Sequence, residues 1–319
     1  MFVFASALAA IIPMVTYLFL IWSFDRYDRE PIKLVIVSYI WGAVGAIIFA
    51  IIGSIIFSIA VESFTTNQSE LDKFRIIIIA PFVEEITKGF FLLIVINYNK
   101  FDNITDGLVY GGAIGLGFGM TENFLYFVSY GSSLKDWIII VIMRSLFSAV
   151  MHCISTGTLG AAFGLAKFKN KIFKILYPII GLVLAMAIHF TWNFSVSDET
   201  TAPFGFLFIL LSIIIFISVF SISVLSDKKI ILRQLSEEAQ LGIIPFGHPE
   251  ILSSSRRNRI GWIDESIRKI YIKSASTLAF RKMHLNNARG KSREYFQQEV
   301  DSYRSFIRNL VTGSVIPAK

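Results

Sequence analysis

Residues 76–97 read IIIIAPFVEEITKGFFLLIVIN, and this segment decides how the chain folds. It is long and apolar enough to cross a bilayer as one helix, yet Glu84, Glu85 and Lys88 lie near its middle. A charge there costs about 2.5–3.5 kcal/mol, so these groups must be paired, face a wet cavity or take part in chemistry. Lys88 follows Glu84 by four residues and Glu85 by three, so it can neutralise one carboxylate and leave the other free. A buried ion-pair network that only locks helices together is the alternative.

The composition is that of a multi-spanning membrane protein. Of the 319 residues 54% are hydrophobic, and the mean hydropathy is +0.63. Residues 1–225 carry 13 Lys and Arg against 14 Asp and Glu, whereas residues 226–319 carry 17 against 9. We therefore predict a membrane domain over 1–225 and a basic cytoplasmic C-terminal region over 226–319 that lies near anionic lipid and binds no nucleic acid. Cys153 is the only cysteine, which excludes an intrachain disulfide and a cysteine-rich zinc site.

Apolar runs predict an all-α bundle of about seven spans, with a small helical region after the last one. The predicted spans are 2–23, 34–61, 74–97, 105–130, 137–166, 174–196 and 203–225. One set of connections holds most of the basic residues, namely Arg26, Arg29, Lys33, Lys100, Lys167, Lys169, Lys171 and Lys174. The opposite connections hold Lys73, Arg75 and Lys135. The positive-inside rule then predicts a multi-pass cell-membrane protein with the N-terminus outside and the C-terminus in the cytoplasm. His248 and His284 fall in the C-terminal region, where we expect surface residues.

The fourth predicted span is rich in glycine. Its glycines recur at intervals of four, at Gly107, Gly111, Gly115 and Gly119, and such a stripe lets a neighbouring helix approach closely. The same face continues to Glu122, with Asn123 beside it. We expect this tightly packed helix to bring a carboxylate into the bundle.

The fifth and sixth spans add two histidines. The fifth carries Arg144 and His152, and Arg144 is the expected partner of a buried acid. The sixth carries His189 and Asn193, four residues apart on one helical face. With a rise of about 1.5 Å per residue, Glu84, Glu122 and the histidines fall within about one or two helical turns of one depth, in the outer half of the membrane.

Carboxylates and imidazoles that meet in a partly wetted pocket suit one reaction class, the activation of water to attack an amide. A buried glutamate can act as general base, and a histidine or asparagine can donate to the developing oxyanion. Buried glutamate and histidine chains also serve as proton relays, so an ion-coupled or proton-coupled transporter is the runner-up. A third hypothesis is a non-catalytic membrane scaffold whose basic tail recruits a partner.

These residues resemble the motifs of the PrsW family of intramembrane proteases, which is distantly related to the CAAX prenyl proteases. Its Glu-Glu-x-x-Lys element is present at residues 84–88, and its Phe-x-x-x-Glu-Asn element at residues 118–123. The family's single membrane histidine corresponds to His152, and its His-x-x-x-Asn element to His189 and Asn193. The resemblance covers residues 1–225 and leaves the tail uncovered.

The resemblance implies an endopeptidase in regulated intramembrane proteolysis that cuts single-span membrane proteins, in some members an anti-sigma factor. It implies that Glu84 is the general base, that His152 and His189 orient water or stabilise the oxyanion, and that Glu85 and Lys88 form a supporting pair. The surrounding polar shell would consist of Glu122, Asn123 and Asn193. The family is described both as glutamate-type and as metal-dependent. We favour the metal-free mechanism, and zinc on Glu84, His152 and His189 is the alternative.

Overall fold

The computed structural model describes residues 2–62, 67–98 and 101–313, so Lys100 of the charge argument lies outside the described residues. Every regular element in these ranges is helical. The chain divides into two compact units, of which the first comprises Met1–Asp25 and Glu30–Phe220 and the second comprises Arg26–Arg29 and Ser221–Lys319. Each unit is described by itself below.

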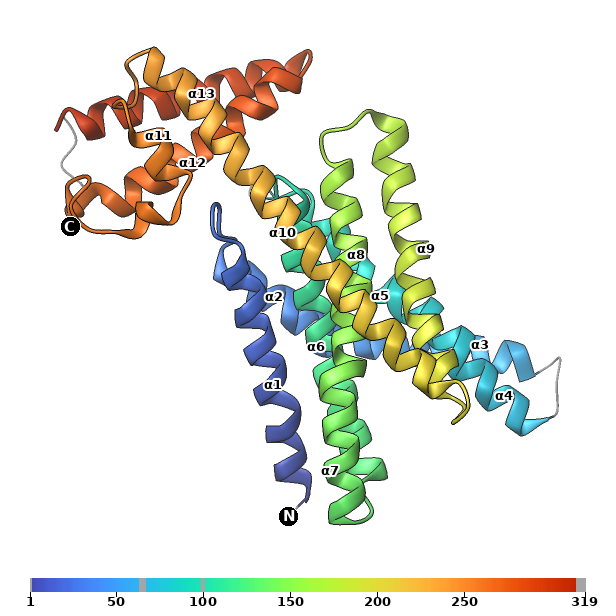
Figure 1. Cartoon of the computed structure of the whole chain (residues 1–319). Coiled ribbons are helices and arrows are strands. Elements are labelled where there is room, and N and C mark those ends of the chain that lie inside the picture. The colour runs from blue at the N-terminus through green and yellow to red at the C-terminus, as the bar shows by residue number, and fades with distance from the viewer. Residues whose placement is uncertain (1, 63–66, 99–100, 314–319) are drawn as a thin grey trace. The chain divides into compact units, whose positions relative to one another are not determined.

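The helices follow one another along the chain with short connections (Figure 1). The first unit contains α1 (Phe2–Phe24), α2 (Ile32–Ile40), η1 (Trp41–Ala46), α3 (Ile47–Glu62), α4 (Gln68–Phe74), η2 (Arg75–Ile79), α5 (Ala80–Val95), α6 (Ile104–Tyr130), α7 (Leu134–Met143), η3 (Arg144–Ser148), α8 (Ala149–Ala166) and α9 (Lys171–Val196). Helix α10 (Ala202–Gln240) begins in the first unit and ends in the second, which continues with α11 (His248–Leu252), η4 (Ser255–Asn258), α12 (Glu265–Asn287) and α13 (Lys291–Val311).

Three π-helical turns, η1, η2 and η3, join helices of the first unit end to end. Each π turn inserts an extra residue into an otherwise continuous helix and thereby rotates the side chains that follow. Two of them lie just before predicted site residues: η2 precedes Glu84, and η3 precedes His152. Such turns are frequent at functional sites.

Among the described residues, five helical stretches are long and apolar enough to cross a membrane. They are Val3–Phe24, Ile32–Glu62, Leu134–Ala166, Lys171–Val196 and Ala202–Gln240. Residues 74–97 and 105–130 were also predicted as spans, and most of each segment is helical. Neither segment is apolar enough to be recognised as a span by its composition alone. The first carries Glu84, Glu85 and Lys88, and the second is rich in glycine. The chain is thus a multi-pass membrane protein of the all-α class.

Helix α6 is the centre of the first unit, since every residue from 105 to 119 is buried. A methyl group added to Gly107 would lie 2.0 Å from the main-chain oxygen of Gly160, and one added to Gly115 would lie 2.1 Å from that of His152. The backbones of α6 and α8 therefore touch, which confirms the close approach predicted from the glycine stripe. This contact places His152 beside the second half of α6.

Gly111→Ala is expected to destabilise the protein by about 1–3 kcal/mol, because the added methyl meets backbone that cannot move aside. It would lie 2.3 Å from the Thr156 carbonyl oxygen. Gly112→Ala is the matched control, since its methyl would meet only side-chain atoms, of Ile21 and Cys153, at 3.0 and 3.2 Å. The midpoint of thermal unfolding in detergent measures both. Equal midpoints for the two variants would contradict the close packing of α6 on α8.

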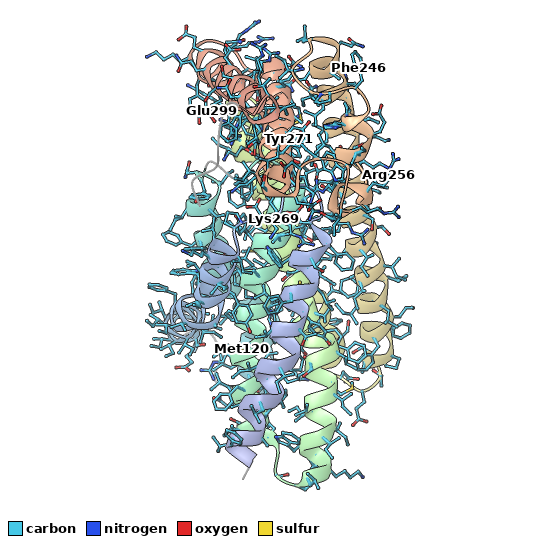
Figure 2. All side chains as sticks on the ribbon, turned by 90° about the vertical axis from the view of Figure 1, so that its left-hand side faces the viewer. Met120, Phe246, Arg256, Lys269, Tyr271 and Glu299 are labelled. Atoms are coloured by element: carbon cyan, nitrogen blue, oxygen red, sulfur yellow. The ribbon has the colours of Figure 1, made fainter. Side chains whose placement is uncertain are left out.

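The second unit has its own apolar core, which includes Leu235, Tyr271 and Leu278. Tyr271 lies inside this unit, whereas Phe246 and Arg256 lie at its surface (Figure 2). Buried Glu238 accepts ion pairs from Lys282 at 2.6 Å and from Arg304 at 2.8 Å. These pairs tie α10, α12 and α13 together.

The expectation of two surface histidines in the C-terminal region is wrong for His284, which is only 2% exposed and whose ring centre lies 5.3 Å from that of Phe296. Its face of α12 is covered by α13, a long-range contact that helical periodicity does not reveal. His248 is partly buried, with Nδ1 at 2.9 Å from the Tyr271 hydroxyl oxygen.

Candidate active site

Helix α5 supplies the charged residues at the centre of the site. Lys88 Nζ lies 2.8 Å from Glu85 Oε1 and 3.5 Å from Glu84 Oε2, so the ammonium favours Glu85. The side chains of Glu85 and Lys88 are fully buried, whereas that of Glu84 is 12% exposed. The ring of Phe118 covers Lys88 with its centroid 4.0 Å from Nζ. Glu84 is thus the more accessible of the two carboxylates.

Glu85 is occupied by four neighbours. Besides Lys88, Oε1 accepts from the Ser155 hydroxyl at 3.1 Å and lies 2.9 Å from His189 Nδ1. Oε2 accepts from the Thr156 hydroxyl at 3.2 Å. A buried carboxylate with this many donors is well compensated for the loss of water. Glu85 therefore joins α5, α8 and α9 and has little capacity left to bind a substrate.

His152, on α8, bridges two charged groups. Its Nδ1 lies 2.9 Å from Lys88 Nζ, and its Nε2 lies 2.7 Å from Glu122 Oε2. An ammonium group can only donate, so Nδ1 accepts, and a neutral imidazole then carries its hydrogen on Nε2. This tautomer donates to the Glu122 carboxylate, which fixes the ring in place.

His189, on α9, has the opposite tautomer. Ionised Glu85 can only accept, so His189 Nδ1 donates to it. The Nε2 lone pair of His189 then faces Glu84, whose Oε2 lies 3.9 Å away. The rings of His152 and His189 are nearly perpendicular, with centroids 4.8 Å apart. Glu84 and His189 Nε2 therefore form a pair of acceptors separated by a short gap.

Arg144 completes the cluster from the π turn η3. Its Nη2 lies 2.7 Å from Glu122 Oε2, its Nε donates to Asn123 Oδ1 at 3.1 Å, and its guanidinium lies 3.6 Å from the centre of the Tyr126 ring. The prediction that Arg144 pairs with a buried acid is confirmed. Arg144 neutralises Glu122 and so leaves Glu84 as the carboxylate shared least with cations.

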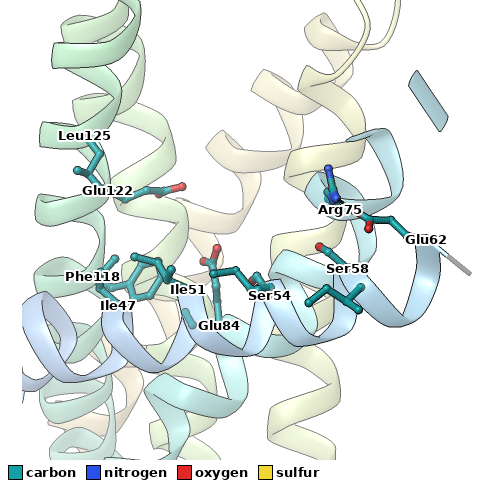
Figure 3. A pocket seen from close by; sticks show the side chains of 13 residues that line it. Ile47, Ile51, Ser54, Ser58, Glu62, Arg75, Glu84, Phe118, Glu122 and Leu125 are labelled. Carbon is teal, nitrogen blue, oxygen red and sulfur yellow. Dashed lines mark hydrogen bonds and ion pairs between the residues drawn. The ribbon is translucent and has the colours of Figure 1, made fainter. Parts of the chain in front are cut away.

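A pocket of about 450 Å³ opens onto this cluster. Glu84 and Glu122 lie in its wall, together with Phe118 and a face of α3 (Figure 3). Glu85, His152 and His189 do not line the pocket. A molecule in the pocket would therefore meet the carboxylate of Glu84 before any other group of α5.

The structure brings together six of the eight candidate residues from four helices: Glu84, Glu85, Lys88, Glu122, His152 and His189. Asn123 joins them through Arg144. Asn193 lies elsewhere, because its amide donates to the Ile76 carbonyl at 2.9 Å, within the π turn η2. Ser155 and Thr156 were not among the candidates. Their spacing of three and four residues after His152 was the signal that could have placed them in the site.

Glu84, His152 and His189 could hold a metal ion. One ligand atom from each lies within 4.8 Å of the other two. Two imidazoles and a carboxylate form a three-ligand set typical of catalytic zinc. His189 already donates its second nitrogen to a carboxylate, as metal-binding histidines do. The donor set fits zinc, provided that His152 exchanges its bond to Glu122 for the ion.

The fold and the site define a polytopic helical membrane protein with a buried cluster of carboxylates and imidazoles beside a pocket. Residues 30–222 match the model of the PrsW family intramembrane metalloprotease. The chain belongs to this family of intramembrane proteases, and the predicted resemblance is confirmed.

Curated relatives agree with the family assignment. The chain is 27% identical to Protease PrsW of Bacillus subtilis (strain 168) over 195 residues. These aligned residues cover 60% of this chain and 82% of that protein. The chain is 28% identical over 194 residues to Protease PrsW of Clostridioides difficile (strain 630), covering 60% and 79%. Protease PrsW of Geobacillus kaustophilus (strain HTA426) is 28% identical over 169 residues, covering 53% and 69%. No solved structure matches the chain.

Proposed function

We propose that this protease hydrolyses peptide bonds of single-span membrane proteins with a water molecule activated by Glu84. The observation that supports this most is the pair formed by Glu84 Oε2 and His189 Nε2, 3.9 Å apart, with Glu84 in the wall of the pocket. A water molecule donates one hydrogen to each acceptor, which turns its lone pairs toward a peptide in the pocket. Glu84 is the general base, and His189 orients the water.

The proposed reaction uses one proton carrier. Glu84 takes a proton as the water oxygen forms a bond to the peptide carbonyl carbon. The Glu84 carboxylic acid then gives this proton to the amide nitrogen as the carbon–nitrogen bond breaks. The products are a new carboxyl terminus and a new amine, and Glu84 returns to its ionised form.

The remaining groups keep Glu84 and His189 in position. Glu85 accepts the Nδ1 hydrogen of His189, and Lys88 pairs with Glu85 while its ammonium lies 3.5 Å from Glu84. His152 and Arg144 hold Glu122 beside the pocket. Asn123 acts through Arg144, and Asn193 acts on the π turn before Glu84. We assign positioning roles to these groups.

Zinc is the second candidate mechanism, favoured by the donor set of Glu84, His152 and His189. When bound, zinc would supply a more acidic water and polarise the peptide carbonyl. Against it stands the Lys88 ammonium, 2.9 Å from His152 Nδ1, which repels a second cation. We therefore favour the metal-free reaction.

Cleavage is accordingly expected to persist after exhaustive dialysis of the purified protein against a strong chelator. The comparison is the initial rate before dialysis, after dialysis and after addition of zinc. Activity that is lost on dialysis and restored by zinc would assign the three residues to a metal centre, and the metal-free mechanism would then be wrong.

We further propose about seven spans, an outer N-terminus and a cytoplasmic C-terminus. This rests on the basic residues of the connections and on the apolar helices. A cut in the outer half of the membrane would suit a substrate such as an anti-sigma factor, whose cleavage begins outside the cell.

Because Cys153 is the only cysteine and is buried, single cysteines introduced at Ser133 and Lys169 can be labelled directly in intact cells. Labelling of Lys169→Cys but not of Ser133→Cys by a membrane-impermeant maleimide would show that the orientation is the reverse of the proposed one.

The test of function uses the full-length chain in liposomes with a set of single-span membrane reporters taken from its host, anti-sigma factors included. The proposal expects at least one reporter to be cut by the wild-type chain and none by His189→Ala at equal amounts of folded protein. Absence of any cut would refute the proposal. Proton uptake that depends on Glu84 would then favour a carrier. Function that requires residues 226–319 but not Glu84 would favour a scaffold.

A further inference from the structure

The pocket is an elongated groove, and its long wall is one face of α3. Ala50, Ser54, Ser58 and Glu62 recur along this wall at intervals of four residues. Glu122 and Leu125 of α6 line the pocket near the Ile47 end of this face, and Glu84 lies between Ser54 and Glu122 (Figure 3). At a rise of about 1.5 Å per residue, the wall from Ala50 to Glu62 is about 18 Å long. An extended peptide advances about 3.3 Å per residue, so the groove accommodates about five residues.

Two hydroxyl groups on this wall have no partner in the part of the chain that the structure describes. Neither Ser54 nor Ser58 donates to a hydrogen-bond acceptor among the described residues. Several hydroxyl groups elsewhere in the apolar helices bond to their own helix, for example Ser218, which donates to Ile214, and Thr191, which donates to Ala187. Unlike the buried hydroxyls of Ser38 and Ser145, which also have no partner in the described ranges, those of Ser54 and Ser58 line the pocket. A hydroxyl in an apolar region without a partner is costly. Ser54 and Ser58 are therefore available to a molecule in the groove.

A substrate helix must unwind before its peptide bond can be cut, and the unwound main chain then needs new hydrogen-bond partners. Inside a membrane every freed main-chain N–H and C=O group must find a new partner, because lipid tails cannot form hydrogen bonds and the hydrocarbon core holds no water. Hydroxyl groups can both donate and accept, so a row of serines suits a main chain of any sequence. The groove leads such a chain directly to Glu84.

We infer that α3 is the docking surface for the substrate main chain, which lies extended in the groove and bonds to Ser54 and Ser58 while its scissile bond meets Glu84. This rests on the proposed function of Glu84. It adds two substrate-binding residues and one bound conformation of the substrate. The exposed ion pair of Arg75 with Glu62 marks the far end of the groove, where the chain leaves the site.

The double variant Ser54→Ala/Ser58→Ala removes both hydroxyls without a steric change. Because two hydrogen bonds to the substrate main chain are lost, kcat/KM for the cleaved reporter is expected to fall about tenfold. Ser218→Ala is the control, since its hydroxyl bonds to its own helix. A double variant with the rate of wild type would overturn the inference. Reporter cleavage that survives Glu84→Gln would instead refute the proposed function, so the two failures are distinguishable.

Cross-linking tests the same surface without relying on turnover. Ile59 and Ile56 lie on the same helix with 63% and 61% of their surfaces exposed, but only Ile59 lines the groove. A benzophenone side chain is placed at either position in the full-length Glu84→Gln variant, which retains uncut reporter. Illumination is expected to join the reporter to position 59 in at least about fivefold excess over position 56. Equal cross-linking from both positions would place the reporter elsewhere and overturn the inference.

Discussion

Glu84→Gln is expected to lower kcat for reporter cleavage about 10³-fold, because an amide cannot accept the proton of water. The fold should persist. Glu84 is partly exposed, and Lys88 keeps its closer partner Glu85 at 2.8 Å. The measurement is the single-turnover rate in liposomes, together with the midpoint of thermal unfolding.

Glu70→Gln is the matched control for this substitution. Glu70 is exposed on α4, which continues through η2 into the helix that carries Glu84, and it is not part of the cluster. Its variant should retain the rate of wild type. A Glu84→Gln enzyme that turns over as fast as the Glu70→Gln enzyme would remove Glu84 from the reaction.

In contrast to Glu84→Gln, which should leave the fold intact, Glu85→Ala is expected to destabilise the fold by about 3–5 kcal/mol. It leaves the buried Lys88 charge without its closest partner. It also removes the acceptor for Ser155, Thr156 and His189. The amount of folded protein in the membrane and its thermal midpoint in detergent report the loss.

A second variant separates the charge from the shape of the side chain. Glu85→Leu combined with Lys88→Met removes both charges and fills similar space, so it should recover part of the stability lost in Glu85→Ala. The double variant should nevertheless be inactive, because His189 loses the carboxylate that sets its tautomer. A Glu85→Ala protein as stable as wild type would show that the ion pair does not hold the site together.

Much of this site follows from local spacing. The positions of Glu84, Glu85 and Lys88 on one helical face require an interaction among them. The glycine stripe of α6 requires a close neighbour, and the structure identifies that neighbour as α8. Helical periodicity gives the face that a residue occupies, and buried charges in apolar helices must meet partners.

Other features could not be derived in this way. Lys88 can reach Glu84 or Glu85 at nearly equal spacing, and the choice depends on Ser155, Thr156 and His189 from other helices. The π turns η1, η2 and η3 shift the side chains after them and have no plain signature in the sequence. Asn193 was expected in the cluster because it lies one turn after His189, yet it reaches the backbone at Ile76.

The groove along α3 was also unforeseen. Its wall of small and hydroxyl-bearing residues lies inside a strongly apolar span, where single serines usually bond to their own helix. Only the packing of α3 against α5 and α6 shows that Ser54 and Ser58 share a pocket with Glu84. Tertiary contacts of this kind depend on how helices rotate against one another.

The central claim is that the carboxylate of Glu84 activates the water that cuts the peptide, and chemical rescue tests it most directly. The pocket of about 450 Å³ is large enough to admit formate beside a truncated side chain. The rate of reporter cleavage by Glu84→Ala is measured at rising formate concentrations, with Glu85→Ala as the comparison. The account predicts background cleavage without formate and a rate that rises with formate for Glu84→Ala alone. Cleavage by Glu84→Ala at the wild-type rate without formate would contradict it.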